Sequence, residues 1–133
     1  MNVRRVSAVA AALAAVAGAL VVAAHASAAP PRMLADLNPA PGEPSQPQDF
    51  AKVGRFVLFS AYSSGIDSEL WRTNGTKAGT RLVKRIQPGP GGSNPNGFRR
   101  LGKRILFAAD DGERGIELWR TDGTARGTKL VRD

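Results

Sequence analysis

The stretch Glu-Leu-Trp-Arg-Thr-Asn-Gly-Thr-Lys-Ala-Gly-Thr at residues 69–80 returns 48 positions later, at residues 117–128, as Glu-Leu-Trp-Arg-Thr-Asp-Gly-Thr-Ala-Arg-Gly-Thr. Nine of the twelve positions are identical. A fixed period of this length is typical of tandem supersecondary units, each of which buries its apolar face against the next. The repeat therefore predicts the architecture of the chain, and it says little about chemistry.

The similarity between the two copies extends upstream of this stretch. Phe50 matches Phe98 and Gly54 matches Gly102 at the same spacing, and residues 34–39 match residues 83–88 with one extra residue in the connection. Turn signals, among them Asn-Gly and Asp-Gly after the motif, divide each copy into four short strands. The expected strands are 33–37, 50–53, 56–61 and 68–73 in the first copy, and 82–86, 98–101, 104–109 and 116–121 in the second.

These strands carry apolar side chains on both faces. Phe56 and Leu58 point to one side of a strand, and Val57 and Phe59 point to the other. A solvent-facing antiparallel sheet alternates apolar with polar residues, so we expect each sheet to lie between neighbours. The sequence therefore predicts an all-β chain with two four-stranded antiparallel blades like those of a β-propeller, and a β-sandwich is the alternative.

Two units are too few to close a propeller, which uses about four to eight blades. The predicted division is a signal peptide at residues 1–28, repeat units at 29–81 and 82–129, and the start of a third, truncated unit at 130–133. The chain is then a piece of a longer array, a protein whose copies assemble, or a stack of two sheets. We expect self-association, or binding of other repeat units, through exposed blade faces.

The N-terminal residues are typical of export. Arg4 and Arg5 precede an uncharged, alanine-rich run at residues 6–24, and Ala26-Ser27-Ala28 fits a small-residue cleavage site. This pattern predicts a secreted, periplasmic or cell-surface protein that has no stable membrane anchor after cleavage. A retained N-terminal anchor is the alternative.

Several kinds of chemistry are excluded by composition. The chain contains no cysteine, and its one histidine, His25, lies in the predicted signal peptide. The mature chain therefore has no disulfide, no histidine metal ligand and no Ser–His or Cys–His nucleophile. No carboxylates are spaced as a catalytic pair, so we expect no catalytic residue, no cofactor and no enzymatic activity.

The second copy of the motif, Glu-Leu-Trp-Arg-Thr-Asp-Gly-Thr at residues 117–124, resembles the ELWxxDGT repeat family, and the resemblance covers residues 33–133. It implies an exported bacterial tandem-repeat protein, sometimes labelled hyalin-like, and it implies no catalytic residue. The first copy departs from the pattern, because Asn74 replaces the Asp. The motif positions are Glu69, Leu70, Trp71, Gly75, Thr76, Gly79 and Thr80, and then Glu117, Leu118, Trp119, Asp122, Gly123, Thr124, Gly127 and Thr128.

Two charged clusters are candidate sites. Carboxylates around Gly112 and Gly115 suggest Ca²⁺, which prefers several oxygen ligands on a flexible loop, but the sequence favours a polar hairpin loop in which Asp and Gly shape the turn. Basic residues around the turn at Gly102 suggest an anionic ligand, or simply a solvated face. The acidic candidates are Asp110, Asp111, Glu113 and Glu117, and the basic candidates are Arg99, Arg100, Lys103 and Arg104.

The expected function follows from the repeat and from the export signal. The sequence favours a non-enzymatic interaction or scaffold module outside the cytoplasm. A cell-surface module that binds carbohydrate or an anionic polymer is the first alternative, and a fragment of a larger enzyme-associated propeller is the second. Trp71 and Trp119 are expected to pack between sheets rather than to stack on sugars. Aromatic residues near the basic cluster are too few to predict specific nucleic-acid binding.

Overall fold

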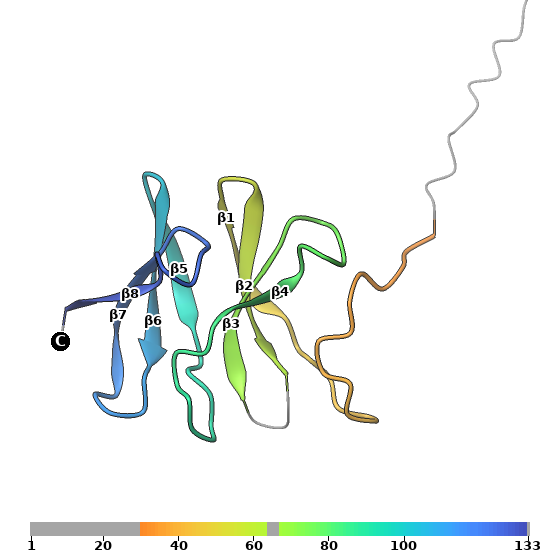
Figure 1. Ribbon diagram of the computed structural model, residues 1–133, viewed down its shortest axis with the longest axis horizontal. Helices are drawn as coiled ribbons and strands as arrows, with labels where there is room; N and C mark the ends of the chain where they lie inside the picture. The colour runs from red at the N-terminus through yellow and green to blue at the C-terminus, as the bar shows by residue number, and fades with distance from the viewer. Residues whose placement is uncertain (1–29, 64–66, 133) are drawn as a thin grey trace, which may run out of the picture. The chain divides into compact units, whose positions relative to one another are not determined.

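The computed structural model describes residues 30–63 and 67–132 (Figure 1). The predicted signal peptide at residues 1–28 lies outside the described residues. Within the described ranges the chain forms eight strands and no helix, and so no helix there is long and apolar enough to cross a membrane. The all-β prediction is confirmed.

The strands form two antiparallel sheets of four, each in simple up-and-down order. The first sheet contains β1 (Gln48–Val53), β2 (Phe56–Tyr62), β3 (Ser68–Thr73) and β4 (Arg81–Lys84). The second sheet contains β5 (Asn96–Leu101), β6 (Arg104–Asp110), β7 (Ile116–Thr121) and β8 (Lys129–Arg132). Hairpin connections join successive strands, so every pairing is local along the chain.

One predicted strand is wrong, and its correction changes the phase of the repeat. Residues 33–37 form no strand, and Arg81–Lys84 closes the first sheet beside β3 instead of opening the second. Likewise, Lys129–Arg132 is the closing strand of the second sheet. The short motif turn returns the chain directly alongside the preceding strand, and closing such a short loop costs little entropy.

The two sheets share the same register and the same irregularities. Phe59 lies opposite Trp71 in the first sheet, and Phe107 lies opposite Trp119 in the second. Each sheet also has an irregularity at the same point of its last pairing, between Leu70 and Trp71 or between Leu118 and Trp119. The sequence repeat is therefore also a repeat of backbone geometry.

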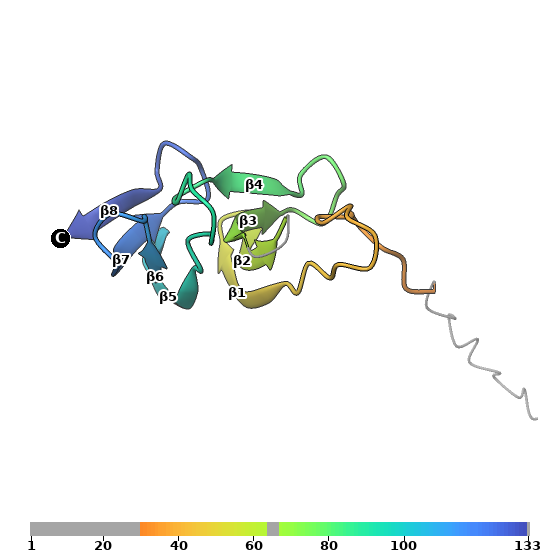
Figure 2. The ribbon, with the colours of Figure 1, turned by 90° about the horizontal axis from the view of Figure 1, so that it is seen from below.

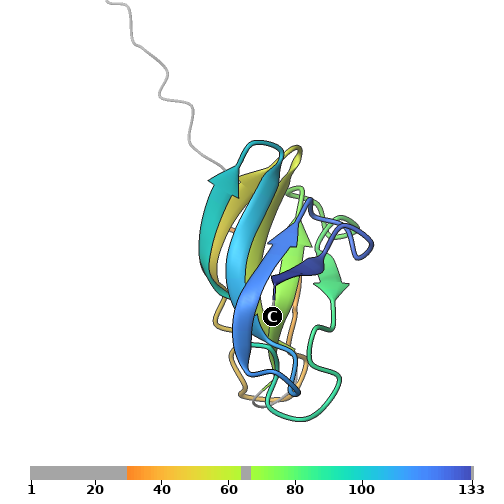
Figure 3. The same ribbon diagram turned by 90° about the vertical axis from the view of Figure 1, so that its left-hand side faces the viewer.

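A single hydrophobic core joins the sheets. Leu58 and Leu70 are fully buried and belong to one cluster with Ile105, Phe107 and Trp119 of the second sheet. Strand β1 contacts β5 and β6, and Figures 2 and 3 show the second sheet stacked beside the first. Both Leu58 and its neighbour Phe59 are buried, which confirms the expectation of apolar faces on both sides of β2.

The connection between the sheets is fixed by a buried carboxylate. Glu69 Oε2 accepts hydrogen bonds from the Ile86 amide at 3.1 Å and from the Ser93 hydroxyl at 2.7 Å. The Ser93 carbonyl in turn accepts from the Asp110 amide in the second sheet at 2.9 Å. This chain of hydrogen bonds ties β3, the proline- and glycine-rich connection and β6 together.

Candidate functional site

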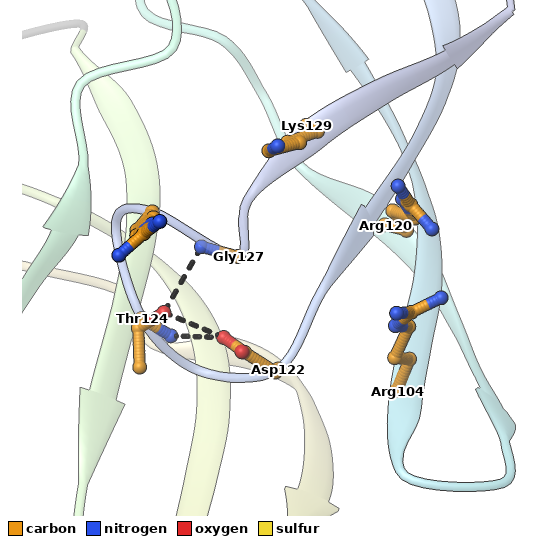
Figure 4. Close-up of a pocket in the computed structure, with 7 residues that line it drawn as sticks. Arg104, Arg120, Asp122, Thr124, Gly127 and Lys129 are labelled. Carbon is orange, nitrogen blue, oxygen red and sulfur yellow. Dashed lines mark hydrogen bonds between the residues drawn. The ribbon is translucent and has the colours of Figure 1, made fainter.

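The two copies of the motif share the geometry of their turn, which is built by side chains that occur in both copies. Asp122 Oδ1 accepts from the Thr124 amide at 2.9 Å and from the Thr124 hydroxyl at 2.7 Å, and Thr124 Oγ1 accepts from the Gly127 amide at 3.0 Å (Figure 4). Asn74, Thr76 and Gly79 make the same three contacts in the first copy. These residues act as turn formers, as expected for Asp, Asn and Thr.

The motif turn of the second sheet is also where the first sheet makes contact. The Arg72 guanidinium donates to the Gly123 carbonyl and lies 4.1 Å from the centre of the Phe56 ring. Burial lowers the pKa of Arg72, and the neighbouring cations Arg81 and Arg55 lower it further. Lys84 Nζ donates to the Thr128 carbonyl at 3.2 Å. Two cations of the first sheet therefore bind backbone oxygens of the second.

The outer face of the second sheet repeats the leucine and the arginine of the first-sheet face that the second sheet covers, with Ile116 in place of Ser68, but it is open. Leu70 is fully buried, whereas its counterpart Leu118 is 45% exposed, and Ile116 beside it is 70% exposed. Arg120 matches Arg72, and within the described residues it has no hydrogen-bond acceptor or carboxylate partner. We define the outer face by Leu101, Ile116, Leu118, Arg120 and Val131.

A basic pocket of about 260 Å³ opens between this face and the second motif turn. Arg104 at the start of β6 and Arg120 on β7 lie along one side, Lys129 lies at the rim, and the turn of Asp122 and Thr124 lies opposite (Figure 4). Arg126 contributes a fourth cation. We call this site the basic pocket, and it is defined by Arg104, Arg120, Arg126 and Lys129.

The predicted basic cluster is only partly brought into this pocket. Arg104 lines it, whereas Arg99 and Arg100 lie on β5 and donate to nearby backbone carbonyls, of Phe98 and Gly102 respectively. Lys103 is exposed in the tight turn. Sequence reasoning missed Arg120, Arg126 and Lys129, although the replacement of Ala78 by Arg126 within the repeat was a visible signal.

The acidic cluster has a structural role. Asp111 Oδ1 accepts from the Glu113 and Arg114 amides at 3.0 and 2.9 Å, and Asp111 Oδ2 lies 2.7 Å from the Arg114 guanidinium. These backbone hydrogen bonds lower the pKa of Asp111. In the described ranges no three His, Cys, Asp or Glu side chains lie close enough together to hold a metal ion, so Asp110, Asp111, Glu113 and Glu117 do not form such a group.

The two tryptophans differ in their surroundings. Trp119 is buried at the interface between the sheets, where its Nε1 donates to the Ala109 carbonyl at 3.1 Å and Lys84 Nζ lies 5.6 Å from its ring centre. Trp71 is half-buried on the other side of the first sheet. Neither indole is freely exposed, which supports the packing role that the sequence favours.

Comparison with known proteins gives no match: no family model matches the sequence, no curated protein is significantly similar to it, and no solved structure matches the fold. The resemblance to the ELWxxDGT repeat family therefore stays a prediction. The functional argument depends on the contact between the two sheets, on the open outer face and on the basic pocket.

Proposed function

We propose that this protein is an exported, non-enzymatic interaction or scaffold module that works by stacking its propeller-like blades against further repeat units. One observation carries the proposal. The second sheet covers apolar residues on one face of the first sheet. Equivalent residues recur on the outer face of the second sheet, where the described part of the chain leaves them uncovered.

The apolar part of the outer face supports stacking. Leu118 and Ile116 expose surface next to Val131, which is itself exposed. Burial of a leucine or isoleucine side chain contributes about 1.5–3 kcal/mol. An apolar patch rimmed by charged residues is typical of a protein interaction surface.

The polar part of the outer face specifies what would bind there. Arg72 and Lys84 use the Gly123 and Thr128 carbonyls of the next motif turn. Arg120 and Arg132 occupy the corresponding positions in the second sheet. Another unit with the same turn presents two carbonyls at this spacing, so a second copy of the chain is the partner that this face fits.

Export is supported by the N-terminal sequence alone. Arg4, Arg5 and the alanine-rich run that follows have the order of a secretory signal peptide.

Analytical ultracentrifugation of residues 29–133 tests stacking. We expect association that increases with protein concentration and that Leu118→Lys abolishes, because the substitution buries an unpaired ammonium in any stacked interface. Glu113→Lys is the control, since it places the same side chain in an exposed loop of the same unit with a charge change twice as large. A wild-type chain that stays monomeric at millimolar concentration contradicts the proposal.

A further inference from the structure

The basic pocket has an internal control in the first repeat, where a pocket is lined by the equivalent positions. There Phe56 stands in place of Arg104, and Ala78 stands in place of Arg126. Arg72, the counterpart of Arg120, lies over the Phe56 ring and donates to the Gly123 carbonyl. The first pocket also contains Arg55 and Arg81, but it is partly apolar, and Arg72 is already bound to the Gly123 carbonyl.

In the second repeat the same hollow contains four cations and one carboxylate. Asp122 Oδ1 already accepts two hydrogen bonds from Thr124. None of the salt bridges among the described residues involves Arg104, Arg120, Arg126 or Lys129. Asp122, whose pKa Arg104 helps to lower, offsets only part of this positive charge. The four cations still repel one another, and a bound anion relieves that repulsion.

The geometry also indicates the kind of anion. Arg104 and Arg120 extend from neighbouring strands, and guanidinium groups pair with two oxygens of one oxyanion. Lys129 adds a point charge at the rim. The volume of about 260 Å³ lies below the roughly 300–1,000 Å³ of pockets for drug-sized ligands. One small, multiply charged group matches this size.

We propose that the basic pocket of the second repeat binds the tetrahedral oxyanion of a phosphate or sulfate group through Arg104, Arg120, Arg126 and Lys129. The group arrives either as a free ion or as an ester on a polymer. The site is distinct from the hairpin cluster of Arg99, Arg100 and Lys103, which lies outside the pocket.

NMR titration of residues 29–133 with sodium phosphate and with sodium sulfate tests this assignment. We expect saturable shifts that centre on the arginine side-chain signals of the pocket. Arg104→Gln combined with Arg126→Ala is the pocket variant, and we expect it to weaken binding roughly tenfold or more, since charge-assisted hydrogen bonds are the strong ones. Both side chains are exposed, so the fold should survive, which circular dichroism checks.

Arg99→Ala combined with Arg100→Ala is the matched control, because it removes the same charge from the same sheet. We expect it to change the dissociation constant less than twofold. An equal loss in the two variants, or the absence of saturable binding by either ion to the wild-type chain, overturns the proposal. Dextran sulfate distinguishes the two sources of the anion. If the natural ligand is an ester on a polymer, dextran sulfate binds far more tightly than free sulfate, and the pocket variant loses that difference. If the natural ligand is a free ion, dextran sulfate and free sulfate bind with equal affinity.

Discussion

Glu69 shows how a buried carboxylate can have a structural role in one repeat only. Its carboxylate is completely buried, and it fixes the connection between the sheets through Ser93 and Ile86. The counterpart Glu117 is only half-buried, since no connection from a following unit covers it in the described residues. The same residue type therefore has a structural role in one repeat and remains accessible in the other.

Burial raises the pKa of Glu69 above its ordinary value of 4.5, although the hydrogen bonds from Ser93 and Ile86 oppose the shift. A raised pKa in the folded state means that the stabilising contribution is complete below the unfolded pKa and is lost as pH rises through the folded one. We therefore expect Glu69→Gln to gain stability relative to the wild type between pH 4 and pH 7.

Urea denaturation of both chains at these two pH values measures the effect. Taking the difference between variant and wild type cancels the opposite contribution of Asp111 and Asp122, whose pKa values are lowered. Glu117→Gln is the control and should show a much smaller dependence. A Glu69→Gln difference that is independent of pH would show that the carboxylate titrates alike in both states.

At the scale of the element, the motif turn has two functions that can be separated. It reverses the chain within its own sheet, and in the second repeat it also fits against the first sheet. Gly75 and Gly123 have the same left-handed backbone, with φ of 85° and 88°. A Cβ on Gly75 meets nothing within 4 Å, whereas a Cβ on Gly123 lies 3.2 Å from Val53 Cγ1.

The two glycines therefore form a matched pair of substitutions. Gly75→Ala should lower the free energy of unfolding by about 1 kcal/mol, because a left-handed conformation disfavours a side chain. Gly123→Ala should cost about 1 kcal/mol more, because it also crowds the contact between the sheets. Urea denaturation compares them, and equal losses would mean that the second turn does not press against Val53.

The strands also show what the sequence can and cannot predict. Periodicity and turn signals correctly identify β2, β3, β6 and β7, together with the apolar character of both faces. They misplace the strand at residues 33–37, because a tandem repeat has no intrinsic starting point. Only hydrogen bonding to β3 reveals that Arg81–Lys84 closes the first sheet.

The basic pocket was harder to foresee for a related reason. Arg104, Arg120 and Lys129 belong to three different strands, and only the antiparallel pairing brings their side chains together. Density along the sequence pointed instead to Arg99 and Arg100, whose positions in the sheet place them outside the pocket. In a β-sheet, charged residues that are adjacent in the sequence point to opposite faces, whereas residues from different strands can lie together on one face.

At the scale of the molecule, the two ends of the stack differ. Arg32, Met33 and Leu34 lie beside the first motif turn, at Gly75–Lys77, just as Arg81, Leu82 and Val83 lie beside the second turn, at Gly123–Ala125. The N-terminal segment thus covers the first motif turn in the same way that β4 covers the second motif turn.

Removal of residues 1–39 should therefore increase self-association, because it uncovers the side of the first sheet that matches the outer face of a second copy. The contact is head-to-tail, so it produces open chains or closed rings rather than a symmetric dimer. Sedimentation velocity measures the size distribution, and Leu118→Lys in the shortened chain should restore the monomer. If the shortened and full chains sediment alike, the N-terminal segment does not block association through the first sheet.

Arg120 connects the two proposals, because its counterpart Arg72 already binds the neighbouring unit. A guanidinium that is hydrogen-bonded to an oxyanion cannot at the same time donate to a carbonyl of a second copy of the chain. We expect ligand occupancy and polymer growth to compete for this one side chain. Free phosphate or sulfate would then act as a chain terminator, setting the length to which such stacks extend.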